Sequence, residues 1–341
     1  MLLNGQMRMI WRWNLAKSTG VLYGASKSFK TWNLGLLAKY AYERTGKPTL
    51  WITADGGGYK PIQKFVDAGI VQPLVITNDP MRLVIARKVV EGYWPESIDS
   101  EGIRQTKKMM KVPVDSIGCY VFEGVTSIAE SIHSLYRGKK TGMQPAFSEN
   151  VSSDLTDEKG QSLSNTMIGG LSMDSYGLIQ AEMKYILNFS WTLPAEFIWW
   201  SGHEASATDE LTNKVVRGIQ LVGNAATPRI GKEIGYMIHA YRVEIEADKL
   251  TKEKRFETRY YFQSHPDNLI GNIFWEASSR LAGDQIPELL EKYKGGYFVP
   301  SYNKGLDEYL RFEDELVSNG TNDIKEWKKK LDEAKSQEKE K

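Results

Sequence analysis

The amino-acid sequence predicts an α/β protein with a mostly parallel central sheet flanked by helices. Its 341 residues are enough for one large α/β domain or two smaller ones with a substantial core. From residue 20 to about residue 245, short apolar segments alternate with longer helical or loop stretches. Several of these segments are almost continuously apolar, which is typical of strands covered on both faces. The first of them leads through a glycine- and serine-containing loop into an amphipathic segment.

Six segments are expected to be strands and one is expected to be the first long helix. The predicted strands are Gly20–Tyr23, Thr49–Thr53, Pro73–Thr77, Cys119–Glu123, Glu196–Ser201 and Met237–Ile245. The predicted helix covers Trp32–Tyr42, where Leu34, Leu37, Ala38 and Ala41 recur at i, i+3, i+4 and i+7. This spacing produces one apolar face that is suited to packing on the sheet.

The chain is expected to divide into four parts. These are a lead-in over residues 1–19, a core over residues 20–250, a small C-terminal extension over residues 251–320 and a charged tail over residues 321–341. Two polar segments, 137–172 and 204–232, interrupt the core and are expected to be long loops, which are often functional. The aromatic-rich extension would form a small extra domain or cover the edge of the sheet.

Composition limits the function classes that the chain can belong to. The 44 basic and 43 acidic residues nearly cancel, so any contact with a nucleic acid must come from a local patch. Cys119 is the only cysteine, which excludes an internal disulfide and fits a reducing cytosol. No apolar run approaches the roughly 18 residues of a membrane span, and the N-terminus lacks the apolar region of a signal peptide. A cytoplasmic protein without a membrane partner is therefore expected.

The loop after the first predicted strand has the pattern of a phosphate-binding loop. Such a loop directs backbone N–H groups and a helix N-terminus at phosphate oxygens, while its lysine reaches the β- and γ-phosphates and its hydroxyl binds Mg²⁺. The spacing from Gly24 to Lys30 and Thr31 is that of a Walker A motif. The alternative is an ordinary strand-to-helix turn with a chance Lys-Thr pair. The predicted nucleotide-binding residues are Gly24, Ala25, Ser26, Lys27, Ser28, Phe29, Lys30 and Thr31.

Phe29 is the one departure from that motif. It occupies the position where a Walker A loop has glycine. Because Phe29 carries a Cβ atom and a ring, any backbone geometry that only glycine adopts is expected to be closed to it.

Two carboxylates follow predicted strands and are candidates for chemistry on a phosphate. Asp55 comes directly after the second strand, where ligands bind in open α/β sheets, and it would orient or deprotonate the attacking water. Its Asp-Gly sequence is equally typical of a simple turn. Glu123 ends an apolar strand in the Walker B arrangement and would hold Mg²⁺. The alternative for Glu123 is an exposed residue at an edge.

His203 ends the apolar segment that begins at Phe197. At the carboxyl end of a strand beside a phosphate site, a histidine can sense the γ-phosphate. A lone histidine is otherwise more often an ordinary core or surface residue.

Taken together, these segments resemble the RecA-fold P-loop ATPases, in particular the short phage-encoded proteins of single-strand annealing and recombination. The resemblance covers roughly residues 18–246 and is weaker over Tyr260–Asp267. The family usually has glutamate after the second strand and aspartate after the third, whereas this chain has Asp55 and Glu123. The segments that carry the resemblance are Gly24–Thr31, Thr53–Asp55, Tyr120–Thr126, Trp199–Glu204 and Ile230–Glu233.

The resemblance implies a Mg²⁺-dependent ATPase that assembles as a filament or a ring. Lys30 would bind the β- and γ-phosphates, and Thr31 and Glu123 would hold the metal. Asp55 would activate water and His203 would report the phosphate state. Lys232, after Gly231, matches a position from which related proteins reach into the ATP site of a neighbouring subunit.

The resemblance also implies that single-stranded DNA is the partner. The long segments 137–172 and 205–229 would line the DNA path, and their basic residues would bind phosphates without reading sequence. Solvated charges on loops are the alternative. The residues concerned are Arg137, Lys139 and Lys140 in the first segment and Lys214, Arg217 and Arg229 in the second.

Three functions remain open at this point. The first is a DNA-stimulated ATPase of recombination or annealing, acting in the cytoplasm (the host cytoplasm if the chain is phage-encoded). The second is a replicative helicase or helicase-loading ATPase of the same fold. The third is a nucleotide-binding structural subunit that hydrolyses slowly or not at all. Tyr59, Trp94 and Tyr236 are all candidates for stacking on the adenine base.

Overall fold

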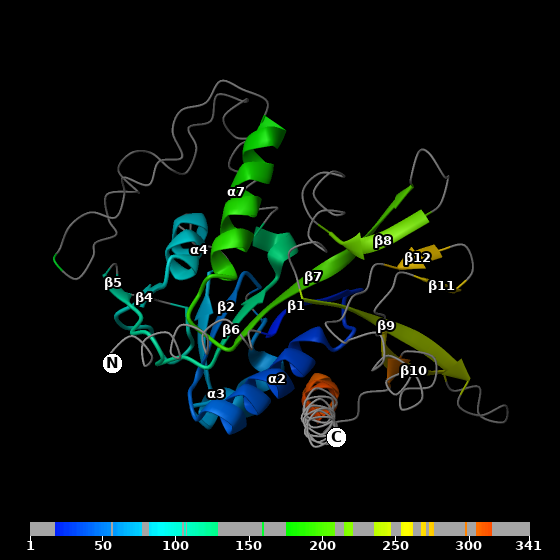
Figure 1. The fold of residues 1–341 in the computed structure, drawn as a ribbon, viewed down its shortest axis with the longest axis horizontal. Coiled ribbons are helices and arrows are strands. Elements are labelled where there is room, and N and C mark those ends of the chain that lie inside the picture. The colour runs from blue at the N-terminus through cyan, green and yellow to red at the C-terminus, as the bar shows by residue number, and fades with distance from the viewer. Residues whose placement is uncertain are drawn as a thin grey trace, which may run out of the picture.

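The central sheet is mostly parallel, as the sequence predicts. The computed structural model describes residues 18–55, 57–76, 82–103, 106, 108–128, 159, 175–208, 215–220, 235–246, 254–261, 267–270, 273–275, 297–298 and 305–315. The parallel part of the sheet has the strand order β3-β2-β6-β7-β1-β9, so β1 lies between β7 and β9 (Figure 1). All six predicted strands are present. Their bounds are β1 (Ser18–Gly24), β2 (Thr49–Thr53), β3 (Val71–Val75), β6 (Cys119–Glu123), β7 (Phe197–Thr208) and β9 (Tyr236–Glu246).

Further strands extend the sheet beyond its parallel centre. β10 pairs antiparallel with β9, and β13 pairs antiparallel with β10. β8 pairs antiparallel with β7, β12 pairs with β8, and β11 pairs with β12. β4 and β5 form a separate antiparallel pair. These strands are β4 (Tyr93–Pro95), β5 (Met109–Lys111), β8 (Val215–Ile219), β10 (Lys254–Tyr261), β11 (Asp267–Ile270), β12 (Ile273–Trp275) and β13 (Tyr297–Phe298).

The predicted loop over residues 204–232 is partly wrong. β7 continues to Thr208, and β8 then returns antiparallel to it, with Glu204 opposite Ile219. Polar composition favours a loop, but the backbone hydrogen bonds of an antiparallel pair do not depend on apolar side chains. Part of the segment expected to line a DNA path is therefore β-strand.

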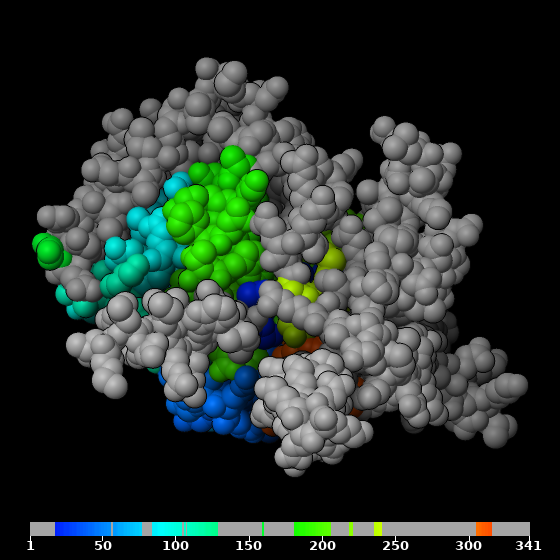
Figure 2. All heavy atoms as spheres, viewed as in Figure 1, coloured from blue at the N-terminus to red at the C-terminus, as the bar shows by residue number. Residues whose placement is uncertain are grey.

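Helices cover the two faces of the parallel sheet because neighbouring strand residues point to opposite faces. Val21 and Tyr23 belong to the core under α4 and α7, whereas Leu22 belongs to the core under α2 and α3. In the space-filling view, α4 and α7 lie side by side on one flank of the molecule (Figure 2). The helices are α2 (Lys30–Thr45), the 3-10 turn η1 (Lys60–Ile62), α3 (Gln63–Asp67), α4 (Arg82–Val90) and α7 (Ser175–Ser190).

α2 is the helix that positions the candidate site. The four residues of its predicted apolar face are fully buried, which confirms that face. A helix over residues 306–315 packs beside α2 (Figure 1), and its Leu306, Tyr309 and Leu310 side chains are buried in the same core. The part of the C-terminal region that the structure describes thus adds strands to the central sheet and a helix to the α2 face.

Candidate functional site

The loop between β1 and α2 is the centre of the candidate site. It joins Gly24, the last residue of β1, to Lys30, the first residue of α2. Gly24 lies so close to β9 that a Cβ atom would be 1.8 Å from the carbonyl oxygen of Ala240, so only glycine fits there. The buried Ser28 hydroxyl donates a hydrogen bond of 2.8 Å to the carbonyl oxygen of Ala25 and closes the turn.

Phe29, at the N-cap of α2, has a left-handed backbone. Its φ is 59° and its ψ is 24°, values that residues other than glycine also adopt at a cost, so the expectation about geometry open to glycine alone stays a prediction. Phe29 lies at the surface, where it is 59 % exposed. Lys27 is also left-handed, with φ 59°. Each such non-glycine residue costs about 1–2 kcal/mol, so the loop stores strain at two positions.

The Lys30 ammonium lies over the loop. Its Nζ donates hydrogen bonds to the carbonyl oxygens of Gly24 at 3.0 Å and Ala25 at 2.6 Å. Burial lowers the pKa of Lys30 to about 8, while the negative charges of Glu123 and Glu204 oppose this shift. Lys30 therefore places its amino group where the loop would receive a phosphate, within the influence of two carboxylates.

Thr31 and Glu123, the predicted metal ligands, are in direct contact. Glu123 ends β6 and is only 6 % exposed, so the interpretation of an exposed edge residue is wrong. Its Oε1 accepts a hydrogen bond from the Thr31 hydroxyl, and its Oε2 accepts one from the Trp51 indole at 3.1 Å. Burial raises the pKa of Glu123 to about 7, although the Thr31 and Trp51 hydrogen bonds lower it in part.

This pair has the donor chemistry that Mg²⁺ requires. A hydroxyl and a carboxylate are oxygen ligands, and Mg²⁺ is commonly held by one or two carboxylates together with phosphate oxygens and waters. Among the described residues, no group of three or more His, Cys, Asp and Glu side chains is placed to hold a metal ion. A divalent cation at Thr31 and Glu123 would thus need its remaining ligands from a phosphate and from water.

Asp55 has the turn geometry that was the alternative interpretation. Its Oδ1 accepts a hydrogen bond of 3.2 Å from the N–H of Gly57, and the residue is exposed. Thr53 faces Glu123 in the β2–β6 register, and the charge of Asp55 contributes to the raised pKa of Glu123. Asp55 is therefore close to the site, with its carboxylate engaged in a local turn.

His203 lies beside the loop, though not at the end of its strand. In the parallel register of β1 and β7, His203 is the partner of Gly24. β7 continues five residues further to Thr208, so it is β1 that ends at this level. The backbone N–H of His203 donates to the Thr126 hydroxyl at 3.0 Å, and the residue is exposed.

Two side chains that the sequence analysis did not assign to the site lie next to it. Glu204 on β7 and His239 on β9 form a hydrogen bond between Oε2 and Nε2, 2.7 Å long. His239 is buried, and it was overlooked because a histidine within an apolar strand resembles a core residue. The sequence did contain one signal for Glu204, because this residue directly follows His203, which was already a candidate site residue.

The remaining predicted residues divide into three groups. Tyr59 and Trp94 are buried in the two cores, and Tyr236 stacks on Trp199 with ring centroids 5.8 Å apart. The structure describes the backbone of Arg217 in β8, opposite Ser206, but not its side chain. The residues outside the described part of the chain are Arg137, Lys139, Lys140, Lys214, Arg229 and Lys232.

Two comparisons with known proteins give no match that would assign a family or a function to the chain. In the part of the chain that the structure describes, no helix is long and apolar enough to cross a bilayer. No protein-family model matches the chain, and a search of curated proteins returns no significant match.

Proposed function

We propose that the chain binds ATP at the loop over residues 24–31 and hydrolyses it as a RecA-like ATPase acting on single-stranded DNA in recombination or annealing. The observation that carries the proposal is the position of the Lys30 ammonium, which two carbonyl oxygens of its own loop hold at the N-terminus of α2. A lysine at that place is the group that a triphosphate requires.

The chemistry follows from the residues around that lysine. Loop N–H groups and the N-terminus of α2 attract phosphate oxygens, and Lys30 exchanges its carbonyl contacts for them. Thr31 and Glu123 would hold Mg²⁺, which neutralises charge on the phosphates when bound. The exclusion of water from the buried Glu123 strengthens every electrostatic interaction there. DNA binding and assembly rest on the sequence resemblance.

Substitution of Lys30 tests the proposal directly. Lys30→Ala is expected to abolish binding of a fluorescent ATP analogue, because the cation that faces the phosphates is removed. Lys39→Ala is the matched control, since Lys39 lies on the same helix in a half-exposed pair with Glu43. Equal affinity of wild-type protein and Lys30→Ala would refute nucleotide binding at this loop.

The DNA role needs its own measurement. Single-stranded DNA at low salt is expected to raise the rate of phosphate release, and the stimulation should fall as salt increases because phosphate contacts release counterions. No stimulation at low salt would contradict the DNA part of the proposal while leaving ATP binding in place.

One observation favours a second candidate function. The Asp55 carboxylate, which stands where the family has its catalytic glutamate, accepts a hydrogen bond from its own turn. If no other group activates water, the chain would be a nucleotide-binding structural subunit. Tight ATP binding without phosphate release, with or without DNA, would select this candidate.

A further inference from the structure

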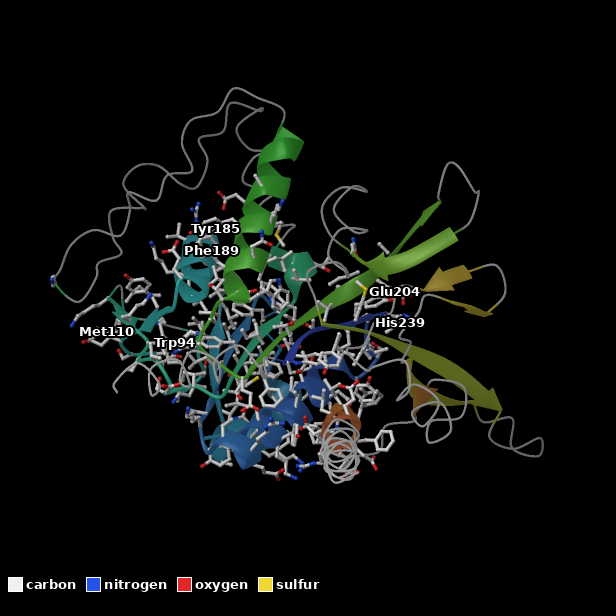
Figure 3. The ribbon with its side chains drawn as sticks, in the orientation of Figure 1. Trp94, Met110, Tyr185, Phe189, Glu204 and His239 are labelled. Carbon is white, nitrogen blue, oxygen red and sulfur yellow. The ribbon has the colours of Figure 1, made fainter. Side chains whose placement is uncertain are left out.

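The two strands that flank β1 continue past its end, and a pair of side chains joins them close to that end. β1 stops at Gly24, which faces His203 on β7 and Ala240 on β9. One residue further along β7 is Glu204, and one residue earlier on β9 is His239. Figure 3 shows these two side chains next to each other where β7 and β9 diverge.

His239 fixes the position of the Glu204 carboxylate. The imidazole is 1 % exposed and packs against the Tyr23 ring, with centroids 4.9 Å apart. A carboxylate only accepts hydrogen bonds when ionised, so the imidazole donates from Nε2 to Glu204 Oε2. The Glu204 side chain is 26 % exposed, which leaves this carboxylate in contact with solvent, unlike that of Glu123.

The same carboxylate is near enough to the loop over residues 24–31 for its charge to act there. The negative charge of Glu204 acts on the Lys30 ammonium, as the charge of Glu123 does. The two glutamates differ in their surroundings, because Glu123 is buried against Thr31 and Trp51, whereas Glu204 is oriented by a histidine and reaches water. Two carboxylates with different environments at one site are suited to different roles.

We propose that Glu204, oriented by His239, is the carboxylate that activates the attacking water, the role that the sequence analysis assigned to Asp55. The inference rests on the proposed ATPase function. The water oxygen forms a bond to the terminal phosphorus, and the bond from that phosphorus to the bridging oxygen breaks with its electron pair passing to ADP. The proton of the water passes to the Glu204 carboxylate. His239 is a positioning residue, because it acts through Glu204.

The first test compares Glu204→Gln with Asp55→Asn. Loss of a general base costs typically about 10²–10⁴-fold in rate, so Glu204→Gln is expected to lose phosphate release by that factor. Its affinity for a fluorescent triphosphate should be unchanged or tighter, because a negative charge near the phosphates is removed. Asp55→Asn should change the rate less than threefold. Glu96→Gln is the control, since it makes the same change in the exposed pair of Glu96 with Lys108.

The second test separates positioning by His239 from a general effect on folding. His239→Gln retains an N–H group that can reach Glu204 and should keep most of the rate, whereas His239→Leu should lose turnover with little change in triphosphate affinity. Glu204→Asp, with a shortened carboxylate, should fall between wild type and Glu204→Gln. Thermal melting of each variant verifies that it folds.

The outcomes distinguish the two proposals. A wild-type protein that binds no triphosphate overturns the proposed function and this inference together. A wild-type protein that binds triphosphate without releasing phosphate overturns the role of Glu204 and retains nucleotide binding. Hydrolysis by Glu204→Gln at the wild-type rate, or loss of hydrolysis in Asp55→Asn alone, overturns only the role of Glu204.

Discussion

The residues that cap the two ends of α2 both have a left-handed backbone, but one is glycine and the other is phenylalanine. At the C-terminal end, Gly46 has φ 69°, donates its N–H to the carbonyl oxygen of Tyr42 and has open space around it. At the N-terminal end, Phe29 has φ 59° and makes no side-chain cap. Glycine adopts this region freely, whereas phenylalanine is strained. Strain is thus confined to the end that forms the candidate site, as is common for functional loops.

Both ends of α2 are also attached to the helix over residues 306–315, by different chemistry. Near the N-terminal end, the buried Asn33 amide donates to the Phe29 carbonyl oxygen at 3.1 Å and accepts from the Leu306 N–H at 3.0 Å. Near the C-terminal end, Arg44 pairs with Asp314 at a half-exposed position. A buried hydrogen-bond link is costly to break and an exposed ion pair is not, so the N-terminal attachment should dominate.

The largest expected effect is that of Asn33→Ala. The substitution leaves the buried N–H of Leu306 without its acceptor and removes the side-chain donor to the Phe29 carbonyl oxygen. We expect the free energy of unfolding to fall by about 2–3 kcal/mol. Urea unfolding measures this, and a loss below about 0.5 kcal/mol would show that the link contributes little.

The next largest effect concerns Glu313, on the helix that both ends of α2 contact. Burial raises the pKa of Glu313 from its ordinary value of 4.5 to about 7, although hydrogen bonds from Tyr309 and Tyr236 lower it in part. The folded state therefore retains the proton more strongly than the unfolded state, and stability is lost as pH rises from 4.5 through 7.

Glu313→Gln should remove this loss. At pH 8 the variant is expected to be about 1–3 kcal/mol more stable than the wild type, and at pH 4 the difference should largely vanish. Urea unfolding at the two pH values provides the measurement. An equal difference between the proteins at both pH values would refute titration of Glu313 as the cause.

One substitution at each end of α2 tests the backbone strain directly. Gly46→Ala should destabilise the protein by about 1 kcal/mol, because alanine is strained at this φ. Phe29→Gly should instead stabilise it by about 0.5 kcal/mol, since relief of about 1–2 kcal/mol exceeds the added entropy of the unfolded chain. Thermal denaturation of the pair should therefore show shifts of opposite sign. Shifts of the same sign would contradict a strained Phe29.

The smallest expected effect is that of Arg44→Ala. Its pairs with Asp314 and Glu196 are half-exposed, so we expect a loss of about 0.5 kcal/mol in dilute buffer. The loss should shrink in about 1 M salt, where the Debye length is about 3 Å. A salt-independent loss would indicate that the contact of the Arg44 guanidinium with the Phe197 ring, 5.8 Å from its centroid, matters more than the two ion pairs.

The parallel core was predictable because its sequence signal is local. Cys119–Glu123 and Thr49–Thr53 are apolar runs short enough to be strands, and the structure places them where expected. The buried position of Glu123 followed from the four apolar residues before it. By contrast, β8 and β10 are strands in polar or mixed sequence, and their pairing depends on neighbours that composition does not reveal.

The Glu204–His239 pair could not be predicted for a different reason. The two residues are 35 positions apart, and they meet only because β7 and β9 flank β1 in the sheet. Strand order is a property of the whole fold, which no single segment encodes. The left-handed backbone of Phe29 could not be predicted either, since phenylalanine rarely adopts a φ of 59° and its residue type gives no signal for it.

The hydrogen bond from the Trp51 indole to Glu123 gives the protein an optical reporter of its own. An indole emits differently when the charge beside its N–H changes, and Glu123 Oε2 lies 3.1 Å from that group. Arrival of a cation or an anion at Thr31 should therefore alter the ultraviolet emission without any attached dye. The difference spectrum between wild type and Trp51→Phe isolates this signal from the other indoles of the chain.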